Sequence, residues 1–348
     1  MNDLSRAHFS EIKHLFCSTS LLCNKSCGYC YLPSKSRKNK YSIPLNELVK
    51  YLLIFKKLNV GYVTLVGGEP ALLENFNIIT QTISDLGFNL IVHTNGSLSK
   101  EQLFHLTKLR VVYISFSLDS LDPKINDTNR FKGATEEVIR KIDETSSFNL
   151  PIRISTVITK ENMNDIYPLV RFAETKNINL INIHRLEILN HQTENVKNIS
   201  LSPEEWITQF KDWLTVAKET KIFLRAPISF MPLKYVLEIK NKNIDCPSKY
   251  YDTFNLFPSG NVYRCPLLVN ENIFAWNIKN QNILSESPKD KSLFEENKDC
   301  NGMCPIIIKR YNTQYKEFFP VCPFIKTTLN PLGGVSNGVW DEIVFDFI

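Results

Sequence analysis

Apolar and polar residues follow two different periods along residues 14–190, one typical of buried strands and one typical of helices. Short apolar runs at 14–21, 62–66, 88–92, 111–117, 152–158 and 180–188 predict six strands. Between the runs, apolar residues recur at helical spacing, as at Leu45, Leu48 and Leu52. Strands that alternate with helices imply parallel strands with right-handed crossovers. Six such units are too few for a closed eight-stranded barrel, so we expect an α/β fold with an open, partial (β/α)6 TIM barrel.

Helix starts give a second local signal. Ser99 followed by Gln102 resembles a capping box, in which side chains satisfy free backbone amides at a helix start. Ser202 and Pro203 open another helix, whose apolar face at Trp206 and Trp213 we interpret as packing. The polar stretch 191–199 shows no pattern and is interpreted as a linker.

The pattern changes near Cys246, after which short strands, turns and scattered thiols predominate. We therefore expect four parts in the chain. These are the barrel at 1–190, a linker with bridging helices at 191–240, a small Cys-rich α+β domain at 241–327 and a tail at 328–348. The tail is Gly-rich and then apolar, which is compatible with an added edge strand.

Composition narrows the class of protein. The 348 residues are 43% hydrophobic and 22% charged, which is ordinary for a globular protein with a sizeable core. The chain has no long apolar run, and its first residues are polar, so we expect a cytoplasmic protein without a membrane partner. A net charge of +5 is only mildly basic. The Lys/Arg-dense piece 35–40 is short and is interpreted as a solvated loop, so we expect no nucleic-acid partner.

Nine cysteines carry more information, because grouped thiols in a reducing compartment indicate metal ligands. Cys23, Cys27 and Cys30 form a C-x3-C-x2-C array with no fourth thiol nearby. A [4Fe–4S] cluster normally takes four Cys ligands, so three would leave one iron open. Structural zinc needs four N or S ligands, and the nearest histidine, His14, lies nine residues upstream of the array. An odd trio also suits disulfides poorly.

The array, with the aromatic Tyr29 before its last Cys, resembles the signature of radical S-adenosylmethionine (radical SAM) enzymes. The resemblance implies that the open iron binds the amino and carboxylate groups of S-adenosylmethionine. It also implies that one-electron reduction cleaves this cofactor to a 5′-deoxyadenosyl radical, which abstracts hydrogen from a substrate. Gly67-Gly68-Glu69-Pro70 is similar to the family motif that receives the methionine amino group, and Glu69 would then face an ammonium. The simpler alternative for these glycines is a tight strand-to-helix turn.

Two further segments extend the resemblance. Ser117-Leu118-Asp119, with 126–127 and 130–133 after it, and the segment 153–157 are similar to the fourth and fifth strands of peptide-modifying radical SAM proteins. The array, the Gly-Gly turn and these polar segments follow predicted strands, and ligands of such folds bind at the carboxyl ends of the strands. The resemblance implies that further cofactor contacts come from Tyr29, Asn95, Ser117, Asp119 and Arg153.

The second group of thiols comprises Cys246, Cys265, Cys300, Cys304 and Cys322. Its G-x4-C at 260–265 and C-x3-C at 300–304 resemble a truncated SPASM/twitch extension. The resemblance implies one auxiliary [4Fe–4S] cluster, held by Cys246, Cys265 and Cys304 plus either Cys300 or Cys322. A zinc site with four thiolates is the alternative. Cys17, on the first predicted strand, is most simply a buried structural thiol.

These features predict an enzyme that oxidatively crosslinks or dehydrogenates a residue of a ribosomally synthesised peptide. The auxiliary cluster would accept an electron or bind substrate, and a flavodoxin- or ferredoxin-type protein would supply electrons. Only twenty-two residues precede Cys23, too few for a leader-binding domain. A precursor peptide would therefore be recognised by the barrel, by the C-terminal region or by a separate leader-binding protein.

Alternatives remain open at this level. The substrate could instead be a small-molecule alcohol or aminocyclitol, or the reaction a radical peptide epimerisation with Cys17 or a C-terminal thiol as hydrogen donor. Sulfatase-maturing relatives carry Asp where Pro266 stands, which argues against that activity. A non-enzymatic iron–sulfur electron carrier or zinc module would not need the Gly-Gly turn. Candidate bases, for which packing or salt-bridge roles are equally open, are His93, His184 and Glu187.

Overall fold

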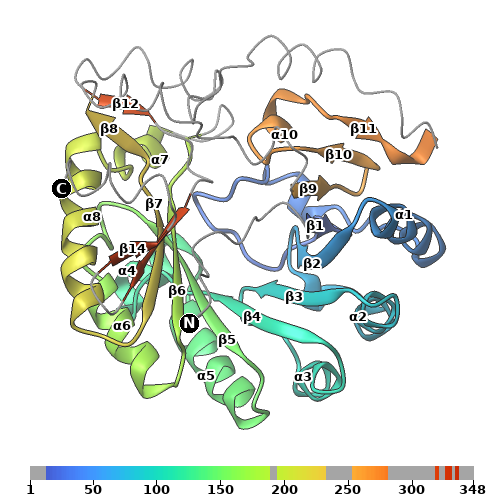
Figure 1. Cartoon of the computed structure of the whole chain (residues 1–348), viewed down its shortest axis with the longest axis horizontal. Coiled ribbons are helices and arrows are strands. Elements are labelled where there is room, and N and C mark those ends of the chain that lie inside the picture. The colour runs from blue at the N-terminus through green and yellow to red at the C-terminus, as the bar shows by residue number, and fades with distance from the viewer. Residues whose placement is uncertain are drawn as a thin grey trace, which may run out of the picture.

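The computed structural model describes residues 13–188, 194–232 and 253–280, together with short strands at 318–320, 326–330 and 334–336. These residues form one twelve-stranded sheet and a separate pair of strands. The sheet is curved, and the helices lie along its outer side (Figure 1). Within the described ranges, no helix combines the length and apolar character needed to cross a membrane.

Seven parallel strands form the middle of the sheet, in the order β1 to β7. Their bounds are β1 Lys13–Ser18, β2 Val60–Val66, β3 Asn89–Thr94, β4 Val111–Ser117, β5 Ile152–Ile158, β6 Leu180–Arg185 and β7 Phe223–Pro227. The helices between them are α1 Leu45–Lys57, α2 Phe76–Asp85, α3 Lys100–Leu106, α4 Pro123–Asn129, α5 Ala134–Ser147, α6 Ile166–Thr175, α7 Glu194–Asn198 and α8 Pro203–Lys218. The predicted α/β fold with an open, partial barrel is confirmed.

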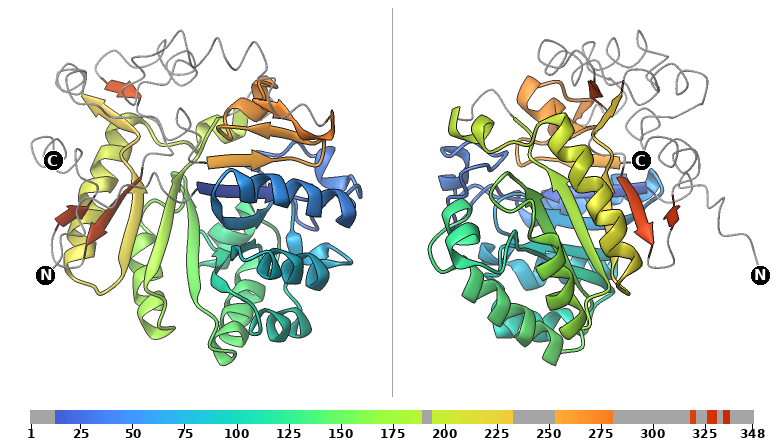
Figure 2. Two further views of the ribbon diagram at one scale, coloured as in Figure 1. Left: turned by 45° about the vertical axis from the view of Figure 1, so that its right-hand side comes forward. Right: turned by 90° about the vertical axis from the view of Figure 1, so that its left-hand side faces the viewer.

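Strands from the C-terminal part of the chain extend both edges of this sheet. Next to β1 lie β9 Thr253–Leu256, β10 Asn261–Tyr263 and β11 Trp276–Asn277, with α10 Leu268–Glu271 between β10 and β11 (Figure 2). Next to β7 lie β13 Lys326–Asn330 and β14 Gly334–Ser336, while β8 Phe230–Pro232 pairs with β12 Phe318–Pro320. The sheet thus continues across the predicted boundaries at 190, 240 and 327, and the division into four domains stays a prediction.

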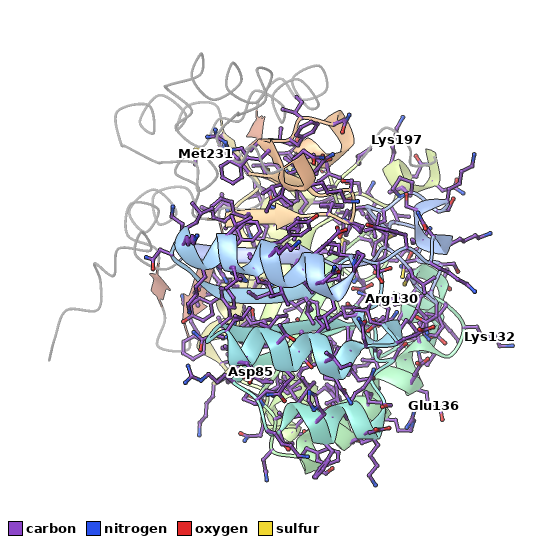
Figure 3. The ribbon with its side chains drawn as sticks, turned by 90° about the vertical axis from the view of Figure 1, so that its right-hand side faces the viewer. Asp85, Arg130, Lys132, Glu136, Lys197 and Met231 are labelled. Carbon is purple, nitrogen blue, oxygen red and sulfur yellow. The ribbon has the colours of Figure 1, made fainter. Side chains whose placement is uncertain are left out.

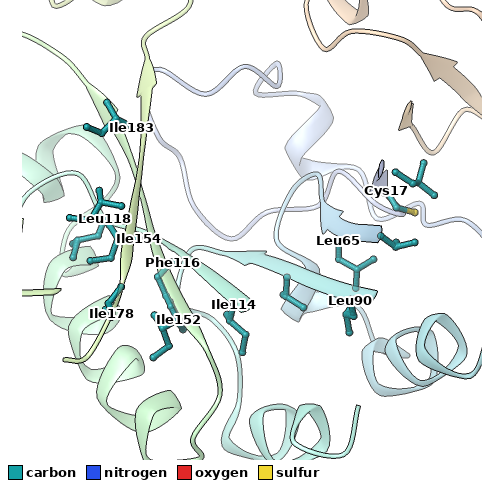
Figure 4. Close-up of a cluster of buried hydrophobic side chains, with 14 of the residues drawn as sticks. Cys17, Leu65, Leu90, Ile114, Phe116, Leu118, Ile152, Ile154, Ile178 and Ile183 are labelled. Carbon is teal, nitrogen blue, oxygen red and sulfur yellow. The ribbon is translucent and has the colours of Figure 1, made fainter. Parts of the chain in front are cut away.

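The main core lies between the sheet and the outer helices. Alternate residues of each strand point to opposite faces, so every second residue of β5, such as Ile152 and Ile154, faces the helices and is buried. The same buried layer includes Cys17, Leu65 and Phe116 (Figure 4). Cys17 has no exposed surface, and burial raises the pKa of its thiol to about 12. It therefore packs as an apolar residue on the helix side of β1.

Polar residues line the inner face of the strands. On β1 the ring of His14 stacks on Phe16 with 4.4 Å between ring centroids, and its Nε2 lies 2.5 Å from Thr64 Oγ1. Burial, with a smaller contribution from the charge of Arg225, lowers the pKa of His14 from 6.5 to about 4. This histidine is therefore neutral at pH 7 and is engaged with β2.

His14 is expected to make the protein less stable in mild acid. Below pH 6.5 the unfolded chain protonates His14 while the folded protein does not until about pH 4, so stability rises with pH in this window. The free energy of unfolding should therefore fall by about 3 kcal/mol between pH 6.5 and 4 through this group. Urea unfolding of the wild type and of His14→Gln at several pH values checks this, because the variant should show a flatter dependence. Parallel pH profiles of the two proteins would contradict it.

Both predicted helix starts are confirmed. Ser99 Oγ accepts a hydrogen bond from Gln102 N at 3.0 Å, and Gln102 Oε1 accepts one from Ser99 N at 2.8 Å. The start of α8 repeats this arrangement with Ser202 and Glu205. Trp206 and Trp213 on α8 are buried, as their interpretation as packing residues requires.

Three local predictions were wrong. The sixth strand ends at Arg185 and not at residue 188. The first strand ends at Ser18 and not at residue 21, because the carbonyls of Ser20 and Leu22 accept hydrogen bonds from the turn after β2. The stretch 191–199, predicted to be a linker, contains the one-turn helix α7. Val196 of α7 is buried against Tyr29 and Leu186, and so short a helix has no room for a periodic pattern.

Candidate active site

The loop between β1 and α1 carries Cys23, Cys27 and Cys30 across the carboxyl ends of the parallel strands (Figure 1). It bonds first to the end of β2, where Gly68 N and Glu69 N donate to the loop carbonyls of Ser20 and Leu22 at 3.2 and 2.8 Å. Beyond β3, the Nδ2 of Asn95 lies 3.7 Å from Cys23 Sγ. Contacts with successive strand ends therefore hold the thiols where a parallel sheet binds ligands.

The second half of this loop contacts the elements that follow β4 and β6. Gly28 N donates to the carbonyl of Asn129, the last residue of α4, at 3.1 Å. Tyr29 is buried and packs with Leu186, which follows β6. The loop thus spans the opening of the partial barrel.

The two glycines after β2 are required by the Cys loop itself. A Cβ on Gly68 would lie 1.9 Å from the carbonyl oxygen of Leu22, and one on Gly67 would lie 2.4 Å from that of Ser20. Gly67 also has a φ of +120°, which side-chain-bearing residues rarely adopt. The sequence predicted a close approach of this turn to a ligand; in the structure its close neighbour is the backbone that carries the cysteines.

Gly68→Ala is expected to displace the Cys loop. The methyl group would force apart the two backbones and break the hydrogen bonds from Gly68 and Glu69, at a cost of about 2 kcal/mol. Gly28→Ala is the matched control, because a Cβ there meets no atom within 4 Å. Urea unfolding and iron content after anaerobic reconstitution measure the effect. Equal behaviour of the two variants would show that the backbone contact is dispensable.

Glu69 joins the ends of β2 and β3. Its carboxylate is 4% exposed and accepts hydrogen bonds from Ala71 N, Thr94 Oγ1 and Asn95 N at 3.1, 2.9 and 2.7 Å. Burial raises the pKa of Glu69 to about 7 against the opposing effect of these donors. The next residue, Pro70, is buried and begins the 3-10 helix η3 Pro70–Leu72. Glu69 therefore fixes the position of Asn95 beside Cys23, and contact with a cofactor amino group stays a prediction.

Asp119, two residues after the end of β4, accepts three hydrogen bonds through its carboxylate, as Glu69 does. Its Oδ1 accepts hydrogen bonds from Arg130 Nη2 at 2.6 Å and from Val157 N at 2.9 Å, and its Oδ2 accepts one from the Tyr29 hydroxyl. Asp119 and Arg130 are 1% and 8% exposed. Figure 3 shows Arg130 inward of Lys132 and Glu136, which project at the rim of this region. Asp119 thus links the Cys loop, β4, β5 and the end of α4.

Residues outside the predicted set complete this network. Asn126 Oδ1 accepts from Asp119 N, and Asn162 Nδ2 donates to the Asp119 carbonyl, both at 2.9 Å. Arg130 and Asn126 stood within the segments that carried the family resemblance but received no role. A buried arginine needs an anionic partner, but the burial of Arg130 is visible only in the structure, so the sequence alone does not point to its pairing with Asp119.

A second link ties the Cys loop to α5. Lys25 Nζ lies 2.7 Å from Glu137 Oε2 and 3.5 Å from the centroid of the Phe131 ring. The Lys25 side chain is only 8% exposed. Sequence reasoning assigned this lysine no role, because its partner is separated from it by more than a hundred residues.

The three thiols suit an iron–sulfur group. None is in a disulfide, and the charge of Cys30 adds to burial in raising the pKa of Cys23 and of Cys27, the latter to about 11. The three are thus within electrostatic reach of one another. In the part of the chain that the structure describes, no three His, Cys, Asp or Glu side chains are placed to hold a single metal ion. Three free cysteines on one loop are the kind of donor set that an iron–sulfur group takes.

Ser117 and Arg153 occupy different ends of the barrel. Ser117 is the last residue of β4, half-buried and beside Ser155 in register. Arg153 is near the start of β5, with its guanidinium carbon 3.8 Å from the centroid of the Tyr113 ring. At about 3.3 Å per residue, it lies about 13 Å along the strand from Val157, which contacts Asp119. The structure therefore brings Ser117, but not the backbone of Arg153, to the end where the thiols lie.

The candidate bases and the candidate hydrogen donor Cys17 also lie in different parts of the barrel. His93 is half-buried near the end of β3, and His184 Nε2 on β6 lies 2.9 Å from Ser155 Oγ and 3.1 Å from Asn182 Nδ2. Glu187 forms an ion pair with the buried Arg185 at 2.8 Å. Cys17 belongs to the main hydrophobic core between the sheet and the helices.

Cys265 belongs to the described part of the second thiol group. It follows β10 and packs on a small cluster formed by Leu32, Phe257, Tyr263 and Leu268. Cys30 packs on the same cluster. Cys246, Cys300, Cys304 and Cys322 lie outside the described residues.

Comparison with known proteins gives independent information. Residues 18–173 match the family model described as the radical SAM superfamily. An uncharacterized protein of Methanocaldococcus jannaschii is 25% identical over 292 residues, which are 81% of this chain and 93% of that protein. A GTP 3′,8-cyclase of Campylobacter jejuni is 29% identical over 172 residues, so this chain spans about half (53%) of that relative's length.

A solved structure shares the fold. The crystal structure of SuiB from Streptococcus suis superposes with a TM-score of 0.65 at 19% identity, covering 82% of this chain and 68% of that one. The similarity extends beyond the region matched by the family model. The residues 18–173 that match the radical SAM family model include all three cysteines of the loop, the Gly-Gly turn and Asp119.

Proposed function

We propose that this protein is a radical SAM oxidoreductase that modifies a residue of a ribosomally synthesised peptide. Cys23, Cys27 and Cys30 would hold a [4Fe–4S] cluster, which would bind S-adenosylmethionine. When bound, these groups supply one-electron cleavage of S-adenosylmethionine and hydrogen abstraction from an unactivated C–H bond. The observation that carries the proposal is the Cys loop, which strand-end contacts hold across the carboxyl ends of a parallel sheet.

The chain's own residues position the reacting groups and exclude water. Tyr29 lies between Cys27 and Cys30 in the sequence, and the hydrogen bond from its hydroxyl to Asp119 orients the buried ring. Arg130, next to Cys27, supplies positive charge to a site with three thiolates. Asn95 Nδ2 points toward Cys23 Sγ, and the Glu69 carboxylate holds the Asn95 backbone. These contacts fix the loop before any ligand binds.

Two observations support an oxidised peptide as the product. One solved structure of SuiB is described as bound to its precursor peptide SuiA, and that protein shares the fold of this chain. Cys265 packs on the same cluster as Cys30, so an auxiliary [4Fe–4S] cluster at Cys265 would adjoin the Cys loop. Such a cluster, completed from Cys246, Cys300, Cys304 and Cys322, would accept an electron from the substrate or bind it.

A small-molecule substrate is the second candidate. The match to GTP 3′,8-cyclases favours it, because the name of these relatives denotes an activity on a small molecule, GTP. The polar inner face of the strands, with His184 and Arg153, offers groups that a small polar substrate would contact.

The decisive experiment uses the anaerobically reconstituted full-length protein with S-adenosylmethionine and dithionite. Formation of 5′-deoxyadenosine and methionine tests the radical SAM chemistry, and absence of both would overturn it. Co-expression with a peptide encoded beside the gene tests the substrate, with loss of two hydrogens from the peptide as the expected result. Cofactor cleavage with an unmodified peptide would favour the small-molecule alternative. About eight irons per chain would indicate the auxiliary cluster, and about four its absence.

A further inference from the structure

The Cys loop lies in a segment whose Lys and Arg residues are not balanced by any Asp or Glu. Between Glu11 and Glu47 the chain contains no Asp or Glu. It contains six basic residues there, which are Lys13, Lys25, Lys35, Arg37, Lys38 and Lys40. Lys25 is neutralised by Glu137, but within the described residues no carboxylate lies within 4.0 Å of the amino groups of Lys35, Lys38 or Lys40.

The basic stretch packs directly on the cysteine array. Cys23 N donates to the Arg37 carbonyl at 2.9 Å, and Arg37 Nη1 lies 3.4 Å from the Lys25 carbonyl and 3.5 Å from that of Cys27. Arg37 is half-buried, whereas its neighbours Lys35 and Lys38 are exposed. The short helix η2 Ser36–Lys38 therefore has one side against the thiols and the other in solvent.

Another part of the chain adds to this surface. Lys279, which follows β11, donates from its Nζ to the Tyr41 hydroxyl at 3.0 Å and lies 5.0 Å from the ring centroid. Tyr41 is 42% exposed, and Tyr31, next to Cys30, is 40% exposed. We name the exposed set Lys35, Lys38, Lys40, Tyr41 and Lys279 the basic loop face. It combines cations with an exposed aromatic ring directly outside the Cys loop.

We propose that the basic loop face is the docking surface for an acidic one-electron transfer protein. The proposal rests on the proposed function, which requires one electron to enter at the cluster. In the docked complex, the donor's reduced centre loses one electron and the iron–sulfur group held by Cys23, Cys27 and Cys30 gains it. Charge complementarity selects the partner, because redox encounters are small and depend on electrostatic steering.

The contact between Arg37 and Cys23 distinguishes this face from an ordinary solvated loop. A lysine-rich surface elsewhere would attract an acidic protein without bringing its redox centre near the cluster. Here the backbone of η2 is hydrogen-bonded to the residue that carries the first thiol. A partner on the exposed side of η2 is therefore separated from the thiols by only this thin segment.

The test compares two variants with the same change in net charge. In the loop variant, Glu replaces Lys35, Lys38 and Lys40. In the control variant, Glu replaces three other exposed lysines, Lys50, Lys124 and Lys211. The reconstituted proteins are mixed anaerobically with a reduced acidic flavodoxin, and cluster reduction is followed by absorbance and electron paramagnetic resonance. At low salt the loop variant should be reduced roughly tenfold more slowly than wild type, and the control variant nearly as fast as wild type. The wild-type rate should fall as ionic strength rises.

Dithionite provides the internal reference, because this small reductant needs no protein docking surface. The loop variant should be reduced by dithionite at the wild-type rate, and failure to do so would overturn the proposal by showing that the lysines serve the site itself. Equal slowing of both variants with flavodoxin would also overturn the proposal. So would a loop variant that flavodoxin reduces at the wild-type rate although it binds an acidic peptide more weakly than wild type does. If flavodoxin reduces the wild-type protein but the protein does not cleave S-adenosylmethionine, the proposed function is contradicted and the proposed docking surface is not.

Discussion

Cys27→Ala is expected to abolish formation of 5′-deoxyadenosine. The activity should be at least 1,000-fold below wild type, which corresponds to on the order of 4 kcal/mol of barrier. Two thiols on a loop of this length cannot retain the cluster geometry that leaves one iron open for the cofactor. Cys27 is central in the array, since both other thiols contribute to the electrostatics around it. The measurement is anaerobic incubation with S-adenosylmethionine and dithionite, followed by chromatography of the products.

Cys17→Ala is the matched control, since Cys17 is equally a free cysteine of the same N-terminal region. It lies in the core between sheet and helices, and its thiol is protonated at neutral pH because burial raises its pKa to about 12. This variant should lose roughly 1 kcal/mol of stability through the cavity left behind, yet keep cofactor cleavage. Persistent cleavage in Cys27→Ala, or its loss in Cys17→Ala, would reverse the assignment of the two thiols.

The secondary structure was predictable from sequence where a local pattern determined it. Buried strands such as β5 and the capping boxes at Ser99 and Ser202 depend on neighbouring residues alone, and the structure contains them. The helix α7 was missed because Val196 is buried against Tyr29 and Leu186, and such contacts depend on the tertiary structure. A helix of only five residues is also too short to show a periodic pattern.

The site also combines features that follow from local sequence with features that depend on tertiary contacts. The spacing of Cys23, Cys27 and Cys30 is visible in the sequence, and the metal group that it indicates stays a prediction. The contact of Gly68 with Leu22 and the bond of Tyr29 to Asp119 are not visible there, because they depend on which strand ends become neighbours. The Lys35–Lys40 stretch illustrates the consequence. It is an ordinary polar loop in the sequence and becomes part of the site only because Arg37 folds back on Cys23.

Asp119→Ala is expected to be the most destabilising substitution in the network around the thiols. It leaves Arg130 as a buried, unpaired cation and removes the acceptor of the Tyr29 hydroxyl and of the Val157 amide. Breaking a buried ion pair from one side costs about 3–5 kcal/mol, and urea unfolding should show a loss of this size. The Cys loop should be displaced as well, so iron content after reconstitution should fall with stability.

Asp122→Ala controls for the loss of a carboxylate from the same loop. Asp122 is exposed and only caps α4, accepting a hydrogen bond from Lys124 N at 2.8 Å, so its removal should cost about 1 kcal/mol. A double-mutant cycle then isolates the pair. If Asp119 acts mainly by neutralising Arg130, then Arg130→Met in the Asp119→Ala background should restore part of the lost stability, because it removes the unpaired charge while filling a similar volume. Additive losses would instead mean that Asp119 stabilises the site chiefly through Tyr29 and the amide of Val157.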